Sequence, residues 1–286
     1  MLIDGENTVV SDPDKEHCEH ALRSLKHLVV TDIFLTETAQ LADVVLPAAC
    51  WGEVDGVCTN TERRVQRLRA AVPPPGEAKP DWWIISALAR KLGFPGFEYE
   101  SAKEVFNEIC DLSPIYNGLD WDRIDKGEYQ WPVPHKDHAG TPVLHEGEFI
   151  NGRGLFSIVR YRDPCETIDD QFPVWLTTGR RLESYHTRTQ TGRSARIDYL
   201  LPEETLEVHP ADVQAFGLCD GGWCTMSSRR GSVKIKVEST EKSPRGTVFS
   251  SFSFSDVPVN ILTGAGYDPV TDTAELKVCP VKLEPA

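Results

Sequence analysis

The sequence predicts an α/β domain followed by a compact β-barrel domain, and two patterns carry this prediction. A strand–loop–helix–strand unit occupies the first 31 residues, and this unit is the repeating element of α/β folds. The stretch 171–286 instead contains several short strand candidates separated by turns. With 286 residues, 40% of them hydrophobic, the chain is long enough for about two domains with separate cores.

The α/β unit begins at the first residues. Residues 2–4 are expected to form a strand, and Ser11 or Asp12 is expected to cap the next helix, with Pro13 in its first turn. The apolar face of that helix recurs at helical spacing in Cys18, Ala21, Leu22 and Leu25. Residues 27–31 then predict a second strand. Because a parallel sheet is normally covered on both faces, we expect the chain to be the C-terminal portion of a larger protein.

The middle of the chain predicts helices and then a connecting segment. One helix is expected to carry Ile85, Leu88, Ala89 and Leu92 on one side, and Ser101 with Glu104 predicts a capping box for another. Residues 113–170 are rich in Pro, Gly, His and Asp, which is typical of an extended connection. The expected domains are therefore 1–112 (partial α/β), 113–170 (connecting segment) and 171–286 (barrel).

The barrel prediction rests on short strands and one small helix. Strands are expected at residues 174–176, 223–227, 233–237 and 248–252. The turn Arg229-Arg230-Gly231 lies between two of these stretches, so a hairpin is predicted. Pro210 to Phe216, ended by Gly217, is the clear helix of this part, and the combination fits a β-barrel with a small helix.

Charge and hydropathy exclude several classes of function. The chain has 30 Lys and Arg against 44 Asp and Glu, a formal net charge of −14, so we expect no nucleic-acid partner. No apolar run reaches the 18 or so residues of a membrane span, so no membrane insertion is expected. The first residues lack a basic leader with an apolar core. These features predict a cytoplasmic protein.

Metal-binding and catalytic motifs are missing from the sequence. The eight cysteines include no Cys-x-x-Cys, and they are expected to be buried reduced thiols. His17 and His20 are spaced for a metal, but beside Glu16 and Glu19 they indicate a solvated helix face. No dinucleotide, P-loop, serine-hydrolase or zincin motif occurs. We therefore expect no catalytic residue and no metal ligand in this chain.

Several polar residues stand where ligands bind. Asp32 follows the predicted strand 27–31, where a carboxylate could accept hydrogen bonds from guanine, and Asn7 ends the neighbouring strand. Taken alone, each is more typical of a helix cap or a solvated strand end. The arginine-rich segment 53–66 is read as a surface ion-pair network or a cofactor lining. The polar run 177–193 fits phosphate recognition or a solvated loop equally well, and nothing supports His186 as a catalytic base.

Motifs along the whole chain resemble the alpha (large) subunit of molybdopterin-dependent formate dehydrogenases, in the bis-molybdopterin guanine dinucleotide oxidoreductase (dimethyl sulfoxide reductase) family. The resemblance lies in Thr31-Asp32-Ile33-Phe34-Leu35-Thr36-Glu37-Thr38-Ala39, Ala42-Asp43-Val44-Val45-Leu46-Pro47, residues 53–66, Gln130-Trp131-Pro132 and Thr178-Gly179-Arg180. Gly5-Glu6-Asn7 and Ser11-Asp12-Pro13-Asp14 also match. The resemblance implies that the barrel is of the molybdopterin dinucleotide-binding, double-psi type.

The resemblance implies cofactor contacts in both domains. In the α/β domain these would hold one guanine dinucleotide, and they are Asn7, Thr31, Asp32 and Asp81. In the barrel they would surround the pterin and phosphates, and they are Thr178, Gly179, Arg180, His186, Thr187, Phe252, Asn260 and Lys277. The sequence departs from the family at Ser184, where members often carry His.

The implied function is formate oxidation to carbon dioxide, with two electrons passed to iron–sulfur clusters. The implied cofactor is bis-molybdopterin guanine dinucleotide with Mo or W, and the iron–sulfur cluster and the metal's ligands would lie upstream of the matched region. The implied partners are the remainder of the alpha subunit and iron–sulfur or flavin/NAD subunits. The chain by itself is expected to be inactive. Another molybdopterin oxidoreductase, such as nitrate reductase, or a non-catalytic scaffold module remains an alternative.

Overall fold

The computed structural model describes residues 1–264 and 266–286, which divide into two compact units. The first unit consists of Met1–Val30, Phe34–Val44 and Arg160–Ala286. The second consists of Thr31–Ile33 and Val45–Val159. The first unit therefore contains the barrel together with most of the N-terminal α/β elements.

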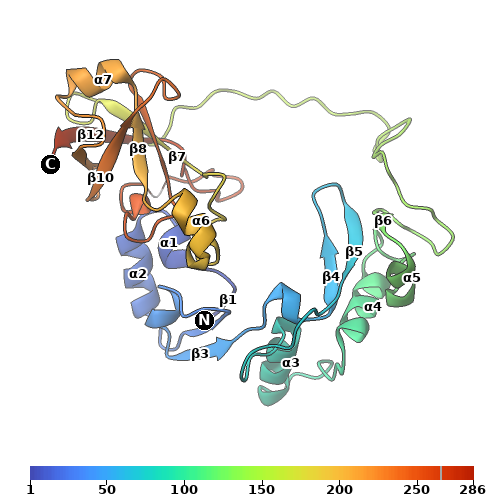
Figure 1. The fold of residues 1–286 in the computed structure, drawn as a ribbon. Coiled ribbons are helices and arrows are strands. Elements are labelled where there is room, and N and C mark those ends of the chain that lie inside the picture. Colours follow the sequence, from blue (N-terminus) through green and yellow to red (C-terminus); the bar gives the residue numbers. More distant parts are fainter. Residues whose placement is uncertain (265) are drawn as a thin grey trace. The chain divides into compact units, whose positions relative to one another are not determined.

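The α/β region is parallel, as the sequence predicts, and its elements follow one another along the first 47 residues (Figure 1). They are β1 (Leu2–Asp4), α1 (Thr8–Ser11), α2 (Lys15–Arg23), β2 (Val29–Asp32), the 3-10 helix η1 (Ala39–Leu41) and β3 (Val44–Pro47). The strands form one sheet in the order β1-β2-β3, and the division between the units falls within β2 and β3. Ile3, Val9, Leu22, Leu28 and Val30 form the core of this region.

The start of α2 differs from the sequence prediction. Asp14, and not Ser11 or Asp12, caps this helix, because its side chain accepts a hydrogen bond from the backbone amide of His17 at 3.3 Å. Residues Thr8–Ser11, which come before Asp14 in the chain, form the short helix α1. The sequence analysis assigned them to a loop. Asn7 stands at the start of α1 without capping it, since its side chain binds elsewhere.

The barrel is closed and mixed, which confirms the predicted β-barrel. Its strands are β7 (Val174–Gly179), β8 (Thr205–Val208), β9 (Trp223–Ser227), β10 (Ser232–Ser239), β11 (Thr247–Ser251) and β12 (Cys279–Pro285), in the order β10-β8-β11-β7-β12-β9. β10 pairs in parallel with β8 and β11 with β7, and the other neighbours are antiparallel. The predicted hairpin is β9–β10, and the predicted helix is α7 (Pro210–Ala215). Helix α6 (Ala195–Leu200) and the 3-10 helices η3 (Thr191–Arg193) and η4 (Val259–Ile261) complete this part.

Alternating strand residues fill the barrel interior. In β7 the buried residues are Val174, Leu176 and Thr178, and in β10 they are Val233, Ile235 and Val237. This alternation follows from the period of two along a strand. Leu206 of β8 is 0% exposed within the same core.

Replacement of Leu206 by Ala should destabilise the barrel by about 2–5 kcal/mol, because it removes apolar contacts and leaves a cavity. Denaturant unfolding of the full chain, followed by tryptophan fluorescence, measures this loss. Leu182→Ala is the matched control, since Leu182 is 98% exposed and its replacement should change the free energy of unfolding by less than about 0.5 kcal/mol. Equal effects of the two variants would show that Leu206 is not part of the core.

The second unit combines a small antiparallel sheet with helices. Its elements are the 3-10 helix η2 (Trp51–Glu53), β4 (Gly56–Thr59), β5 (Arg64–Leu68), α3 (Asp81–Lys91), α4 (Ala102–Leu112), α5 (Trp121–Lys126) and β6 (Tyr129–Gln130). The sheet order is β4-β5-β6, and its core includes Val65, Phe106, Leu119, Ile124 and Val133. Helix α5 and strand β6 lie within the stretch 113–170, in which the sequence analysis expected only an extended connection. Residues 153–164 belong to no helix or strand.

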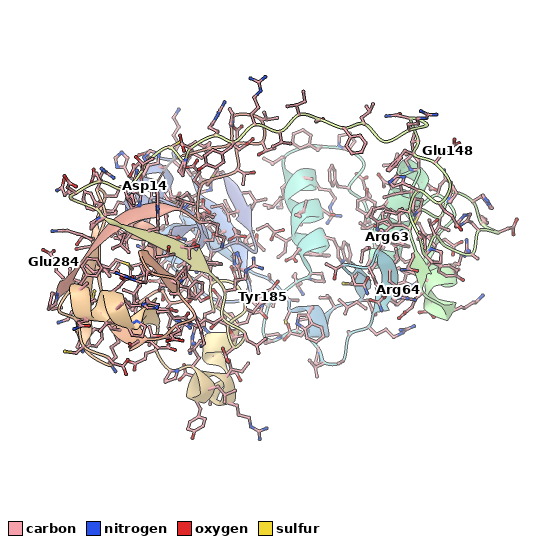
Figure 2. The ribbon with its side chains drawn as sticks, turned by 90° about the horizontal axis from the view of Figure 1, so that it is seen from above. Asp14, Arg63, Arg64, Glu148, Tyr185 and Glu284 are labelled. Carbon is pink, nitrogen blue, oxygen red and sulfur yellow. The ribbon has the colours of Figure 1, made fainter. Side chains whose placement is uncertain are left out.

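The arginine-rich segment 53–66 spans η2, strand β4 and the start of β5, and Figure 2 shows Arg63 and Arg64 projecting from this part of the chain. Arg64 pairs with Glu62 at 2.7 Å, and Arg67 and Arg69 both reach Asp125, at 3.2 and 2.9 Å. Arg67 also stacks on a ring, with its guanidinium carbon 3.5 Å from the centroid of Trp121. Arg67 and Arg69, which directly follow the segment, therefore join this part of the chain to α5 through ion pairs.

The described part of the chain can be compared with the predictions about membrane spans and cysteines. None of its helices is both long and apolar enough to cross a bilayer. Its eight cysteines are free thiols, but the prediction that they are buried holds only for Cys110, Cys224 and Cys279. Burial raises the pKa of the Cys110 thiol to about 12.

Candidate functional site

The carboxyl ends of β7 and β11 bring predicted cofactor residues together. These strands are parallel neighbours, and their last paired residues are Gly179 and Ser251. Arg180 and Phe252 are the next residues, so both leave the barrel at the same end of adjacent strands. In open α/β sheets, ligands commonly bind outside the carboxyl ends of parallel strands, and the ends of β7 and β11 are of this kind. The barrel therefore presents a guanidinium and an aromatic ring at one edge.

Lys277 extends this edge with a second positive charge. Its amine donates a hydrogen bond to the backbone oxygen of Thr178 at 2.8 Å, and the hydroxyl of Thr178 donates to the backbone oxygen of Leu276. Partial desolvation, followed by the charge of Arg180, lowers the pKa of the Lys277 amine below its ordinary value. Within the described residues, no acidic side chain forms an ion pair with Arg180 or Lys277. Two mutually repelling cations thus lie together, and this arrangement favours an anion.

The loop after β7 turns back on itself beside Phe252. His186 has a positive φ of 49°, and its ring meets the ring of Phe252 edge-on, with centroids 5.4 Å apart. The hydroxyls of Thr187 and Thr189 share a hydrogen bond of 2.9 Å. The hydroxyls of Ser184 and Ser253 are buried and have no hydrogen-bond partner among the described residues. Buried polar atoms of this kind are rare, which makes them notable at this edge.

A pocket of about 380 Å³ lies beside this loop. Glu37, Thr187, Thr189, Arg193 and Ser253 contribute the carboxylate, hydroxyl and guanidinium groups that line it. Asn7 lies next to Glu37 and donates to its carboxylate at 2.8 Å, and its own oxygen accepts from the amide and hydroxyl of Thr38 at 3.2 and 2.9 Å. The Asn7 side chain therefore fixes the segment that supplies Glu37.

The pKa of the Glu37 carboxyl lies below its ordinary value. Burial alone would raise it, but hydrogen bonds from Asn7, from a backbone amide and from Ser255, together with the charge of Arg193, outweigh the burial. Glu37 is consequently ionised at neutral pH. Arg193, whose guanidinium carbon lies 4.4 Å from the centroid of the Phe34 ring, is the nearby countercharge.

This shift predicts how stability depends on pH. A folded-state pKa below the unfolded value gives a contribution that is complete above the unfolded pKa and is lost as the pH falls through the folded pKa. Between about pH 7 and about pH 3, the wild-type chain should therefore lose more free energy of unfolding than Glu37→Gln. Urea unfolding of both chains across this range measures the difference, and identical pH profiles would contradict the role of Glu37.

Asn260 is held inside the first unit. It is 2% exposed, and its amide nitrogen donates to the backbone oxygens of Val10 and Ser11 at 2.9 and 3.0 Å. These oxygens belong to the end of α1, where helix carbonyls lack partners. Asn260 thus ties η4 to α1, and its predicted cofactor contact stays a prediction.

The predicted guanine residues of the second unit lie in backbone segments that neighbour Ala48. Thr31 is 1% exposed at the end of β2, and the backbone oxygen of Asp32 accepts from the amide of Ala48 at 3.0 Å. Ala48 also forms a parallel bridge with Lys79, two residues before Asp81 opens α3. The backbone of Asp32 and that of Lys79, two residues before Asp81, therefore both pair with Ala48. Their contact with guanine remains a prediction.

Sequence reasoning missed several groups of this site. Glu37 and Ser253 were not singled out as site residues, although Glu37 lies within a quoted motif. Thr189 and Arg193 lie within the polar run 177–193, for which phosphate recognition was one of two predictions, but they were not named individually as cofactor contacts. The signal that relates Glu37 to Asn7 is a contact across 30 residues, which no local spacing reveals.

Comparisons with known proteins show which proteins the chain is similar to. Two family descriptions match the chain: "Molybdopterin oxidoreductase" over residues 1–91 and "Molydopterin dinucleotide binding domain" over residues 174–280. The F420-dependent formate dehydrogenase subunit alpha of Methanocaldococcus jannaschii is 46% identical over 287 residues, covering 99% of this chain and 43% of that protein. The assimilatory nitrate reductase catalytic subunit of Bacillus subtilis is 36% identical, covering 100% and 42%.

A solved structure shares the fold. The acetylene hydratase of Pelobacter acetylenicus matches with a TM-score of 0.76 at 19% identity, covering all of this chain and 44% of that one. The chain thus spans less than half the length of the relatives it matches.

Proposed function

The chain belongs to the molybdopterin oxidoreductase family, and we propose that it is the C-terminal cofactor-binding part of a formate dehydrogenase alpha subunit. The observation that carries this proposal is the pair of cations at the end of β7. Desolvation and the charge of Arg180 lower the pKa of Lys277, and an anionic ligand would relieve the repulsion between the two cations. A guanine dinucleotide of molybdopterin carries such charge in its phosphates.

Other groups of the described residues fit the same ligand. The unpartnered hydroxyls of Ser184 and Ser253 could donate to pterin or phosphate oxygens, and the ring of Phe252 could pack on a heterocycle. In the second unit, the carboxylates of Asp32 and Asp81 match guanine's paired donors. We propose these residues as cofactor contacts, together with Asn7, Thr31, Thr178, Gly179, His186, Thr187 and Asn260.

We assign a role to each of these groups. Arg180 and Lys277 bind and orient an anionic portion of the cofactor, and the loop 184–187 covers it. When bound, the molybdenum or tungsten cofactor supplies the redox chemistry by which formate loses two electrons and one proton as carbon dioxide forms. The groups that hold the metal, and the iron–sulfur clusters that receive the electrons, would come from the remainder of the alpha subunit and its partner subunits.

Nitrate reduction is the second candidate, because the Bacillus subtilis nitrate reductase subunit matches the whole chain. Formate is favoured since three F420-dependent formate dehydrogenase alpha subunits share 44–46% identity with the chain, against 36% for that nitrate reductase.

The test is to produce the chain together with a polypeptide that corresponds to the part of the Methanocaldococcus jannaschii relative outside the match. We expect formate-dependent reduction of a redox dye by the pair, and none by the 286-residue chain alone. Turnover by the chain alone, or nitrate reduction by the pair without formate oxidation, would contradict the proposal.

A further inference from the structure

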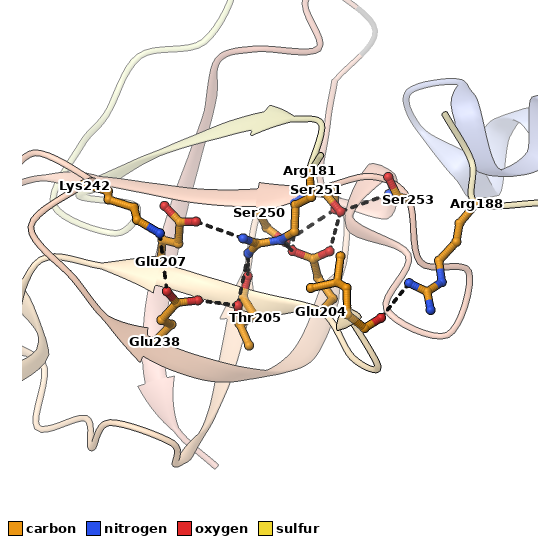
Figure 3. A network of polar contacts seen from close by, with 11 residues as sticks. Arg181, Arg188, Glu204, Thr205, Glu207, Glu238, Lys242, Ser250, Ser251 and Ser253 are labelled. Atoms are coloured by element: carbon orange, nitrogen blue, oxygen red, sulfur yellow. Dashed lines mark hydrogen bonds and ion pairs between the residues drawn. The ribbon is translucent and has the colours of Figure 1, made fainter. Parts of the chain in front are cut away.

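A completely buried carboxylate lies at the barrel edge that carries Arg180. The side chain of Glu204, just before β8, is 0% exposed. Figure 3 shows it among Arg181, Ser250 and Ser251, which come from the segment after β7 and from the end of β11. Glu204 was not singled out from the sequence.

Glu204 is held by donors from two strand ends. One oxygen accepts from Nε of Arg181 at 3.1 Å, from the backbone amide of Ser251 at 2.9 Å and from the hydroxyl of Ser250 at 3.2 Å. The other oxygen accepts from the hydroxyl of Ser251. Since a buried charge is tolerated only when it is paired and hydrogen-bonded, this set keeps Glu204 in one position.

The other nitrogen atoms of the Arg181 guanidinium donate to residues of β8. They reach the carboxylate of Glu207 at 2.9 Å, and the backbone oxygen and hydroxyl of Thr205 at 2.8 and 3.0 Å (Figure 3). The guanidinium is therefore committed to the protein. Burial opposes its charge, but the two carboxylates outweigh this and raise the pKa of Arg181 above its ordinary value.

The neighbours of these anchored residues are the proposed cofactor contacts. Arg180 precedes Arg181, and Phe252 follows Ser251. Because Glu204 holds Arg181 and Ser251, the backbone directly next to Arg180 and Phe252 is held in place as well.

We propose that Glu204 is a positioning residue, which ties the ends of β7 and β11 together and so fixes Arg180 and Phe252 for binding of the pterin dinucleotide. The inference rests on the proposed function. It adds that a carboxylate which does not touch the ligand sets the positions of the cofactor contacts on the barrel.

The test uses GDP, the guanosine diphosphate portion of the cofactor, and calorimetric titration of the full 286-residue chain. Glu204→Gln keeps the size of the side chain and removes its charge, and should weaken GDP binding by about tenfold. The matched control is Asp212→Asn. Asp212 is also buried, and it accepts from the amide of Gly246 at 2.7 Å, next to the opposite end of β11. This control should bind GDP as the wild type does.

A mutant cycle separates positioning from a general loss of structure. If Glu204 acts through Arg180 and Phe252, Glu204→Gln should have little further effect on GDP affinity once Arg180→Ala and Phe252→Ala are both present. Additive losses would overturn the proposal, and so would wild-type affinity in Glu204→Gln. If Glu204→Gln does not fold, Ser251→Ala removes one donor and keeps the ion pair, and the same cycle applies. Failure of the wild-type chain to bind GDP would instead count against the proposed function itself.

Discussion

Replacement of Glu204 by Ala is expected to lower the free energy of unfolding of the barrel by about 3–5 kcal/mol. The variant leaves the guanidinium of Arg181, only 12% exposed, without one of its two carboxylates. It also leaves the buried hydroxyls of Ser250 and Ser251 without their shared acceptor. Unpaired buried groups of this kind cost more than the original pair contributes.

Chemical denaturation, followed by the fluorescence of Trp175 and Trp223 in the barrel, measures this effect. Glu203→Ala is the matched control, because the neighbouring Glu203 is 48% exposed and, among the residues that the structure describes, pairs only with Lys236. A surface pair of this type contributes about 1 kcal/mol or less. If Glu204→Ala and Glu203→Ala were equally mild, the buried network would not be a major source of stability.

Gly118→Ala is expected to destabilise the second unit by about 3 kcal/mol or more, at the upper end of the cost of overpacking. A Cβ at position 118 would lie 2.2 Å from the backbone oxygen of His135 and 2.7 Å from that of Val133. Backbone atoms cannot move away from a close contact as easily as the end of a flexible side chain can. The neighbouring contact, from the amide of Gly118 to the oxygen of Val133 at 2.6 Å, would have to lengthen.

Hydrogen exchange of the amides in residues 45–142 reports this loss without interference from the barrel. The control is Gly127→Ala, whose new Cβ would lie 3.6 Å from the Tyr129 hydroxyl oxygen and 3.7 Å from the ring, which are ordinary contacts, so the variant should cost about 1 kcal/mol or less. Unchanged protection in Gly118→Ala would show that the chain has more room at this turn than the structure gives.

Sequence patterns within a few residues of one another predicted several helices and strands correctly. Helix α7 follows from Pro210 at its first position and from Gly217 just after it, which has a positive φ of 64°. The alternation of Val233, Ile235 and Val237 predicted β10 in the same way. These features need no knowledge of distant residues.

Other elements depend on contacts that spacing does not reveal. Strand β6 has two residues and exists because it pairs with β5, more than 60 residues earlier. Helix α5 did have a local signal, since Asp120 caps it by accepting from the amide of Arg123 at 2.8 Å, but the surrounding Pro and Gly residues favoured a loop.

The same distinction applies to the candidate site. The resemblance to a family supplied Arg180, Phe252 and Lys277, and the structure adds that Lys277 lies beside Arg180. The network around Glu204 could not be predicted, because its partners lie 23 to 47 residues away along the chain. A buried charge of this kind can be recognised only in the folded structure, where its hydrogen-bond donors are known.

The most direct test of the account is the pterin content of the chain produced together with the remainder of the subunit. Asp32→Ala and Arg180→Ala are combined, one from each unit, and the pterin is released, oxidised and measured by fluorescence. Loss of the proposed guanine acceptor and of the proposed phosphate donor should reduce occupancy by about tenfold or more. Occupancy equal to that of the wild type would contradict the claim that this chain holds the cofactor.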